Sequence, residues 1–268
     1  MSKEQMLNFD EGAKKGRVTL VGAGPGAVDL LTIRGQRVLQ QAEVVVYDDL
    51  ANAELLEICP ASAKRIYVGK RAGVHCMLQA QISEILVEEA RLEKRVVRLK
   101  GGDPLVFARG GEEMETLAKA GIDFDIVPGV TSAIAAGAST GIPLTHRDHA
   151  SSVVFVTGHE CAGKSARPNQ VNWAALAQTG ATLCIYMGVR RLADISETLQ
   201  DGGLAGTTPV AIVADATLEE QTVHVTTLAE APIFSESLLS RPSLIIVGEV
   251  VRWAELHDTM ISMQAAGV

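Results

Sequence analysis

Short runs of aliphatic and β-branched residues alternate with longer amphipathic segments along the first half of the chain. Nearly continuous apolar runs of this length are typical of strands that are covered on both faces of a sheet. We therefore expect five buried strands, at residues 17–22, 43–47, 65–68, 95–99 and 124–127. Between them, apolar positions recur at helical spacing from Leu78 to Ala90 and from Met114 to Ala118. This alternation predicts a mostly parallel sheet with helical crossovers.

Two residues are expected to mark helix ends in this half. Asp29 is of a type that caps helix N-termini, and it comes before the helical positions Leu31, Val38 and Ala42. Gly121 follows the second helical pattern, at the place where a left-handed residue ends many helices.

The pattern changes after Gly141. Segment 142–150 has no periodicity and contains a proline, so we place a domain boundary after residue 145. Residues 221–226 alternate between polar and apolar, which is typical of a half-exposed antiparallel strand. Further strands are expected at 152–157, 182–187, 209–214 and 244–251, and helices at 173–178 and near 192–199.

The predicted fold class is therefore α/β, with two α/β domains. Residues 1–16 are expected to form a loose tail, and residues 17–145 an N-terminal domain with a mostly parallel sheet. Residues 146–268 are expected to form a C-terminal domain with a mixed sheet.

Composition narrows the class of protein. Hydrophobic residues make up 47% of the 268 residues, which supplies ample material for a core and excludes disordered and collagen-like chains. The formal net charge of −8 argues against nucleic acid or an anionic membrane as a partner. It does not exclude a small anionic ligand, because the local field at a site decides binding.

The sequence also predicts a cytoplasmic protein. No apolar stretch is long enough to span a membrane, and residues 1–17 contain no secretory signal. The four cysteines have no CxxC spacing, so we expect reduced thiols. His146 and His149 form an HxxH pair on a loop, which is weak support for zinc, and no metal is expected.

Three loops rich in glycine or proline follow predicted strands of the first sheet. Their sequences are GAGPG at 22–26, KGGDP at 100–104 and VPGVT at 127–131. Ligands of open α/β sheets bind outside the carboxyl ends of the strands, and glycine lets backbone approach a ligand closely. The loops together therefore predict a small-molecule site at this edge.

The first loop on its own leaves alternatives open. A strand followed by a glycine loop is also found in dinucleotide-binding domains, where Asp48 or Asp49 would bind ribose. GxGPG departs from the GxGxxG pattern, and Pro25 removes a backbone donor from the loop. A purely structural turn is the other alternative.

Longer motifs resemble those of one known family. In chain order they are VTLVGAGPGAVDLLT, VVVYDDL, YVGKRAG, VVRLKGGDPLVFARGGEE, IVPGVTSAIAAGASTGIPLTHR, VTGH and YMG. They resemble uroporphyrinogen-III C-methyltransferases, which are class III, tetrapyrrole-type S-adenosylmethionine methyltransferases. The resemblance runs from about residue 17 to residue 251. Related corrin-ring methyltransferases share GAGPG and a GDP-type loop. Ala108, Ser139 and Thr140 depart from the usual motif residues, which affects fine specificity more than reaction class.

The resemblance implies a tetrapyrrole methylase-like fold that binds folded S-adenosylmethionine in the cleft between the two domains. The residues that it implies for cofactor binding are Pro25, Gly101, Gly102, Asp103, Val106, Thr131, Ser132, Met187 and Ala216. The residues that it implies for lining the substrate trough are Arg109, Glu112 and Arg147.

The family's proton acceptor falls on Asp48 and its proton donor on Lys70. Lys70 has a second possible role, which is to hold substrate carboxylates by its charge. Arg71 and Lys100 also lie in or beside the motif loops, and we expect them to contribute to substrate binding.

The implied reaction is methylation of uroporphyrinogen III at C2 and C7, which gives precorrin-2 and S-adenosylhomocysteine. The resemblance implies a homodimer, and the product can feed siroheme, cobalamin or haem d1 synthesis. An appended dehydrogenase–chelatase domain, found in some relatives, is not expected. The alternatives are a precorrin C-methyltransferase acting at another ring position, a module that only binds S-adenosyl ligands, and a Rossmann dehydrogenase.

Overall fold

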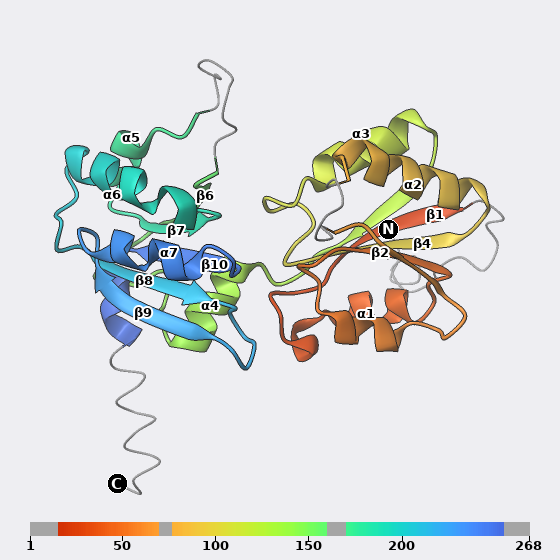
Figure 1. The fold of residues 1–268 in the computed structure, drawn as a ribbon, viewed down its shortest axis with the longest axis horizontal. Coiled ribbons are helices and arrows are strands. Elements are labelled where there is room, and N and C mark those ends of the chain that lie inside the picture. The colour runs from red at the N-terminus through yellow and green to blue at the C-terminus, as the bar shows by residue number, and fades with distance from the viewer. Residues whose placement is uncertain (1–15, 70–76, 160–169, 255–268) are drawn as a thin grey trace, which may run out of the picture. The chain divides into compact units, whose positions relative to one another are not determined.

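The computed structural model describes residues 16–69, 77–159 and 170–254 (Figure 1). The chain divides into two compact units, residues 1–130 and 131–268. The predicted boundary after residue 145 lies later in the sequence. The difference arises at helix α4 (Ser132–Thr140), because its buried alanines pack in the core of the second unit.

The first unit contains a five-stranded sheet in which every pair of neighbouring strands is parallel. The strand order is β3-β2-β4-β1-β5. The strands are β1 (Arg17–Gly22), β2 (Val44–Tyr47), β3 (Lys64–Tyr67), β4 (Arg95–Lys100) and β5 (Asp123–Val127). This confirms the predicted parallel sheet, and each strand lies within one residue or so of its predicted bounds.

Helices cover both faces of this sheet (Figure 1). One face packs against α1 (Ile33–Leu39) and the 3₁₀ helix η2 (Ala53–Ile58), through Val21, Val45 and Leu99. The other face packs against α2 (Gln79–Arg91) and α3 (Gly110–Lys119). Side chains of a strand alternate between the two faces, so both sides of these β-branched strands are buried.

One predicted helix cap is wrong and one helix end is confirmed. Asp29 lies in a short 3₁₀ turn, η1 (Val28–Leu30), and α1 begins later, at Ile33. Its cap is Thr32, whose Oγ1 accepts a hydrogen bond from the Gly35 amide at 3.1 Å. Gly121 follows α3 with a φ of +67°, as a helix-ending glycine should.

The second unit contains a mixed sheet in the order β6-β7-β10-β8-β9. Its strands are β6 (Val153–Thr157), β7 (Thr182–Tyr186), β8 (Pro209–Ala214), β9 (Thr222–Thr227) and β10 (Ser243–Val247). Strands β6 and β7 are parallel, whereas β10 is antiparallel to both β7 and β8, and β9 is antiparallel to β8. The predicted mixed sheet is thus confirmed.

The last strand is shorter than predicted. It ends at Val247, and the chain then turns at Gly248, which has a φ of +141°. The apolar residues Val250 and Val251, which extended the predicted strand, belong to the 3₁₀ helix η5 (Glu249–Arg252) and remain buried there. An apolar run alone cannot distinguish these two conformations.

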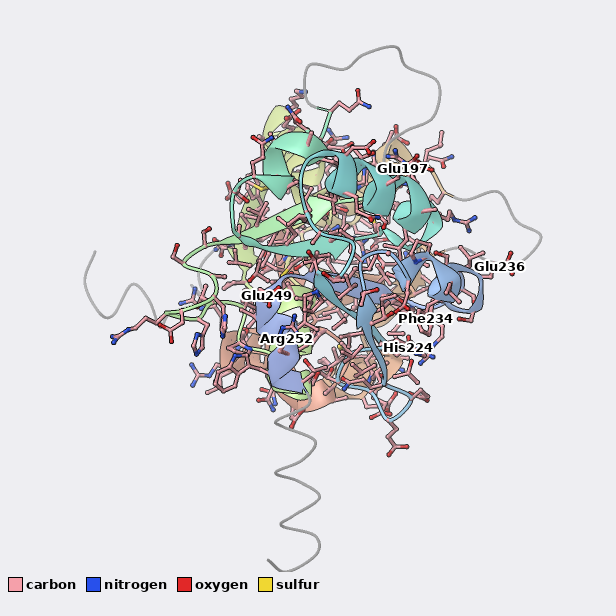
Figure 2. The ribbon with its side chains drawn as sticks, turned by 90° about the vertical axis from the view of Figure 1, so that its left-hand side faces the viewer. Glu197, His224, Phe234, Glu236, Glu249 and Arg252 are labelled. Carbon is pink, nitrogen blue, oxygen red and sulfur yellow. The ribbon has the colours of Figure 1, made fainter. Side chains whose placement is uncertain are left out.

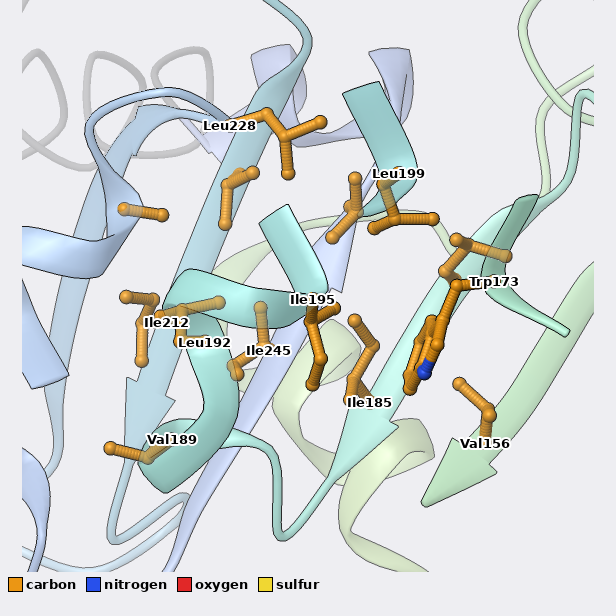
Figure 3. Packing of buried hydrophobic residues seen from close by; sticks show 14 of the residues in the cluster. Val156, Trp173, Ile185, Val189, Leu192, Ile195, Leu199, Ile212, Leu228 and Ile245 are labelled. Carbon is orange, nitrogen blue, oxygen red and sulfur yellow. The ribbon is translucent and has the colours of Figure 1, made fainter. Parts of the chain in front are cut away.

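Both faces of the second sheet are also covered. On one face, Trp173 of α5 (Trp173–Ala177) and Ile195 of α6 (Leu192–Asp201) pack against Ile185 and Ile245 (Figure 3). Small residues of α4 pack on the opposite face. Helix α4 was not among the helices expected from the sequence. The remaining elements are η3 (Val189–Arg191), η4 (Ala231–Phe234) and α7 (Ser235–Leu238).

Strand β9 forms one edge of this sheet and is antiparallel to β8, as predicted. Its exposure alternates, but the exposed side chains are the apolar Val223 and Val225, whereas Thr222 and His224 are half-buried. Its His224 stacks on Phe234 of η4, with 4.6 Å between the ring centroids (Figure 2). Among the described residues, none of the helices has the length and apolar character needed to cross a membrane.

Candidate functional site at the carboxyl ends of the strands

The three glycine-bearing loops of the first unit meet through their backbones. They follow β1, β4 and β5, which are adjacent in the sheet. The Gly102 amide donates to the Gly24 carbonyl at 2.6 Å, and the Gly24 amide donates back at 3.3 Å. A Cβ on Gly129 would lie 2.2 Å from the Gly102 oxygen and 2.8 Å from the Gly22 Cα. The predicted gathering of the three loops at one sheet edge is therefore confirmed.

Asp103 joins two of these loops. One carboxylate oxygen accepts from the Gly129 amide at 3.1 Å, and the other accepts from the Leu105 amide at 2.9 Å. In the GGDP motif, Gly102 thus lets the backbones of the neighbouring loops come close. Asp103 supplies the carboxylate that fixes the loop after β5.

A fourth loop, which follows β2, completes this edge. A Cβ on Gly101 would lie 2.5 Å from the Leu50 carbonyl oxygen, so the two loops touch. The Asn52 side-chain amide donates to the Gly26 carbonyl at 3.0 Å. The YDDL loop therefore supports the GAGPG loop as well as carrying Asp48.

This arrangement differs from a dinucleotide-binding domain. In the Rossmann fold the glycine loop opens a helix whose N-terminus holds the pyrophosphate. Here α1 begins at Ile33, beyond η1, with Thr32 as its cap. Strand β1 lies between β4 and β5. In the Rossmann order 3-2-1-4-5-6, the first strand lies between the second and the fourth. The geometry disfavours the dinucleotide alternative.

Asp48 is held by a buried cation. Its Oδ2 lies 2.6 Å from Arg98 Nη2, and its Oδ1 accepts from the Leu50 amide at 3.1 Å. The Arg98 side chain is only 3% exposed, whereas that of Asp48 is 25% exposed. The Asp48 carboxylate is therefore fixed from the protein side and remains partly accessible to solvent.

Behind Arg98 lies a second buried carboxylate, Glu113 of α3. Its Oε1 is 3.3 Å from Arg98 Nε and 3.0 Å from Lys100 Nζ, and it also accepts from the Gln79 side chain at 2.9 Å. Glu113 is fully buried. Its Oε2 has no hydrogen-bond partner among the described residues. We call Asp48, Arg98, Lys100 and Glu113 the buried ion network.

The network corrects one expectation from the sequence. Lys100 was expected to contribute to substrate binding, but its ammonium group is buried and bonded to Glu113. Burial, together with the nearby charge of Arg98, lowers the pKa of Lys100. The sequence analysis missed Arg98 and Glu113. The signal was present in β4, where Arg98 and Lys100 share one face with the buried Val96.

Arg109 and Glu112, both implied to line the substrate trough, form an ion pair with each other. Two hydrogen bonds of 2.8 and 2.7 Å join the guanidinium to the carboxylate, and both side chains are exposed. The Arg109 guanidinium lowers the pKa of the Glu112 carboxyl. Phe107 and Arg109 have φ values of +52° and +58°, which is rare for residues other than glycine and is enriched at functional sites.

The second unit has its own set of loops at one edge. Strands β6, β7 and β8 run in the same direction, because β7 is parallel to β6 and β10 is antiparallel to both β7 and β8. Their carboxyl ends therefore share an edge. Met187 follows β7, exposed and with a φ of +53°, and Ala216 follows β8 in a buried position.

Thr131 and Ser132 lie at the start of α4, and their segment is tied to the end of β7. The Thr131 hydroxyl lies 2.8 Å from the Tyr186 hydroxyl, which also accepts from the Ala133 amide at 3.1 Å. The structure thus brings Thr131 and Ser132 to the residue that precedes Met187.

The other predicted residues are less closely connected. Pro25 and Val106 are half-buried on their loops. Arg147 is exposed on a turn that the pairing of His146 with Ala150 closes. Lys70 and Arg71 lie outside the described residues. Among the residues that the structure describes, no group of three or more histidine, cysteine, aspartate or glutamate side chains has the arrangement of a metal site.

Comparisons with known proteins agree with this geometry. The chain is 50% identical over 256 residues to siroheme synthase 1 of Serratia proteamaculans, and 51% identical over 237 residues to the siroheme synthase of Baumannia cicadellinicola. These matches cover 95% and 88% of this chain, but 52% and 50% of the relatives. The chain thus spans about half the length of the curated relatives it matches.

Solved structures match over most of their length. Uroporphyrin III C-methyl transferase from Thermus thermophilus has 37% sequence identity and a TM-score of 0.74, covering 88% of this chain and 94% of that one. The same enzyme complexed with S-adenyl homocysteine matches equally well. A cobalt precorrin-4 methyltransferase matches with 28% identity and a TM-score of 0.77.

A family model gives the most general result. The model of tetrapyrrole (corrin/porphyrin) methylases matches residues 17–232, which include the four loops of the first unit and the three of the second. The chain therefore belongs to the tetrapyrrole methylase family, in agreement with the motif resemblance.

Proposed function

We propose that this chain transfers methyl groups from S-adenosylmethionine to C2 and C7 of uroporphyrinogen III, giving precorrin-2. The observation that carries the proposal is the backbone junction of Gly22, Gly102 and Gly129, which gathers the motif loops at one sheet edge. The similar Thermus enzyme, whose structure was solved with S-adenyl homocysteine, supports the choice of cofactor.

The residues present fit S-adenosylmethionine. In the first unit, Gly101 and Gly102 let the motif loops pack closely, and Pro25 and Val106, on two of these loops, are half-buried. In the second unit, Thr131 and Ser132 offer hydroxyls at the start of α4. Met187 is exposed and offers an apolar contact suited to an adenine ring, and the chain at Ala216, whose own side chain is buried, is proposed to close the adenine side. When bound, S-adenosylmethionine supplies a methyl group that is already activated by its sulfonium.

The protein's main task is then to hold the acceptor carbon in line with that methyl group. Reacting atoms held about 3–3.5 Å apart in the right orientation gain much of the rate acceleration from proximity alone. The methylated carbon is quaternary and the ring becomes positively charged, so the macrocycle must lose a proton from another position. Asp48 is suited to accept it, because Arg98 and the Leu50 amide fix a carboxylate that is still 25% exposed.

The substrate carries carboxylates around its ring, and cations at the site recognise them. Arg109 and Arg147 are both exposed and supply such charges. The bidentate contact with Glu112 holds the Arg109 guanidinium in one orientation. Leu105 and Phe107, both exposed on the same loop, offer apolar surface to the macrocycle. Lys70 is proposed either to donate a proton or to bind a substrate carboxylate.

A turnover assay tests the reaction directly. We expect the purified chain, given uroporphyrinogen III and S-adenosylmethionine, to release two equivalents of S-adenosylhomocysteine per macrocycle and to give the absorbance of precorrin-2. Turnover on a later precorrin instead would favour a corrin-ring methyltransferase, the class of the similar cobalt precorrin-4 enzyme. Tight binding of S-adenosylhomocysteine with no turnover on any tetrapyrrole would favour a binding module.

Two substitutions separate the cofactor site from the substrate site. Asp103→Ala removes the carboxylate that accepts from the Gly129 amide, so the dissociation constant for S-adenosylhomocysteine should rise. Arg147→Ala removes an exposed cation, so the KM for uroporphyrinogen III should rise on the order of tenfold, the worth of one charged hydrogen bond. Titration calorimetry and steady-state kinetics measure the two effects. If each variant showed the other's effect, the proposed division of roles would be wrong.

A further inference from the structure

The loop that carries Ala216 has an unusual backbone. Asp215 and Thr217, on either side of Ala216, have φ values of +49° and +72°. Left-handed conformations are costly for residues other than glycine, and for a β-branched residue such as threonine they are true outliers. Such conformations persist only where the surrounding contacts hold them. The contacts of this loop therefore decide its shape.

Arg241 supplies three of those contacts. Its Nε donates to Asp215 Oδ2 at 2.5 Å, its Nη1 donates to Thr222 Oγ1 at 2.9 Å, and its Nη2 donates to the Glu220 carbonyl at 2.5 Å. The Arg241 side chain is 28% exposed and that of Asp215 is 16% exposed, so water screens this ion pair only in part. One guanidinium thus ties both ends of segment 215–222 to the turn before β10.

Two further hydrogen bonds shape the same segment. The Asp215 amide donates to the Pro242 carbonyl at 2.9 Å, so the backbone next to Arg241 also supports the loop. The Thr217 amide donates to the Gln221 side chain at 2.7 Å. Each of these two hydrogen bonds fixes one acceptor. The planar guanidinium of Arg241 fixes three acceptors at once, which a single backbone hydrogen bond cannot do.

We propose that Arg241 is a positioning residue, which holds segment 215–222 in the conformation that presents Ala216 to the adenine of S-adenosylmethionine. This inference rests on the proposed function. Arg241 acts through Asp215 and Thr222, so its effect falls on cofactor affinity. The groups assigned to proton transfer and substrate binding lie on other loops.

The test is the affinity of Arg241→Ala for S-adenosylhomocysteine, measured by titration calorimetry. If the released segment is competent to bind about one tenth of the time, the dissociation constant rises about tenfold. The KM for S-adenosylmethionine should rise in parallel, while kcat at saturating S-adenosylmethionine and the KM for uroporphyrinogen III should stay near the wild-type values. Arg241→Lys keeps the charge beside Asp215 but loses the fork, so it should give an intermediate affinity.

Arg252→Ala is the matched control. Arg252 also makes an arginine–carboxylate pair in the second unit, with Nε 2.8 Å from Glu249 Oε2 (Figure 2). It follows β10, which is antiparallel to β8, so it lies at the opposite sheet edge from Ala216. We expect its affinity for S-adenosylhomocysteine to match the wild type.

The outcomes distinguish this inference from the proposed function. A wild-type chain that fails to bind S-adenosylhomocysteine contradicts the proposed function itself. Wild-type binding with an unchanged affinity in Arg241→Ala overturns the positioning role, and so does an equal loss of kcat at saturation. If Arg241→Ala does not fold, Thr222→Val is the second variant. It removes the hydroxyl that accepts from Arg241 Nη1, and valine is well suited to a strand such as β9. An unchanged affinity in both Thr222→Val and Arg241→Lys then overturns the role.

Discussion

Gly129→Ala is expected to destabilise the first unit severely and to abolish binding of S-adenosylhomocysteine. The added Cβ would lie 2.2 Å from the Gly102 oxygen and 2.8 Å from the Gly22 Cα, and both of these are backbone atoms. No rotation of a side chain relieves such a clash, so the strands that carry the loops must separate. We expect the free energy of unfolding to fall by about 3 kcal/mol or more, the upper end of the range for overpacking.

Urea denaturation measures the loss of stability, and titration calorimetry measures the loss of binding. Gly111→Ala is the matched control, because it adds the same methyl group in the first turn of α3, where no atom lies within 4 Å. Alanine is favoured over glycine inside a helix by roughly 0.5–1 kcal/mol, so this control should be neutral or slightly stabilising. A Gly129→Ala variant that unfolds like the wild type and binds S-adenosylhomocysteine would show that the loops do not need their close contact.

The strands were the most predictable part of this fold. Buried apolar runs placed nine of the ten strands in the described residues within a few residues, because a strand covered on both faces has little freedom in composition. The tenth, β9, was placed by its alternation of polar and apolar residues. The errors came where apolar residues do not reveal the backbone conformation. Val250 and Val251 extended the predicted β10, yet Gly248 turns the chain there into a buried 3₁₀ helix.

Helix α4 shows a different limit of sequence analysis. Its sequence SAIAAGAST consists mostly of small residues, and apolar residues stand on its exposed side, at Ile134 and Ala138, as well as on its buried side. It therefore lacks the contrast between a polar and an apolar face by which amphipathic helices are detected. It packs in the core of the second unit, and the Tyr186 hydroxyl contacts Thr131 across 55 positions of the sequence. No local pattern of the sequence contains these distant contacts, which place α4 in the unit that begins at residue 131.

Part of the candidate site was predictable for a physical reason. Glycines and an aspartate directly after parallel strands must gather at one edge, and Gly22, Gly102, Asp103 and Gly129 do so. Arg98 could be singled out only by its place on a buried face of β4, and Glu113 looks like an ordinary surface charge of a helix in the sequence. Only the three-dimensional packing of α3 on β4 turns them into buried groups that face Asp48 and Lys100.

Glu113→Ala is expected to be the most damaging single change to the buried ion network. Glu113 is fully buried and its Oε1 neutralises Lys100 at 3.0 Å and Arg98 at 3.3 Å. Its removal leaves the Lys100 ammonium, only 4% exposed, without its counter-charge. Breaking a buried pair in this way typically costs about 3–5 kcal/mol. Glu115→Ala is the control on the same helix, because its pair with Lys119 is exposed and should be worth less than about 1 kcal/mol.

The same reasoning predicts that Lys100→Met restores part of the stability lost in a Glu113→Leu variant, which lacks the same carboxylate. In a Lys100→Met, Glu113→Leu double variant both charges are gone, and Arg98 keeps Asp48 as its partner at 2.6 Å. Apolar replacements of similar volume often match or exceed a buried ion pair in stability, so the double variant should unfold at a higher urea concentration than Glu113→Leu alone. A double variant no more stable than Glu113→Leu would mean that lost packing, rather than the unpaired Lys100 charge, destabilises the protein. In the double variant Arg98 still contacts Asp48. Its turnover therefore measures how well this single contact supports Asp48 when positions 100 and 113 carry no charge.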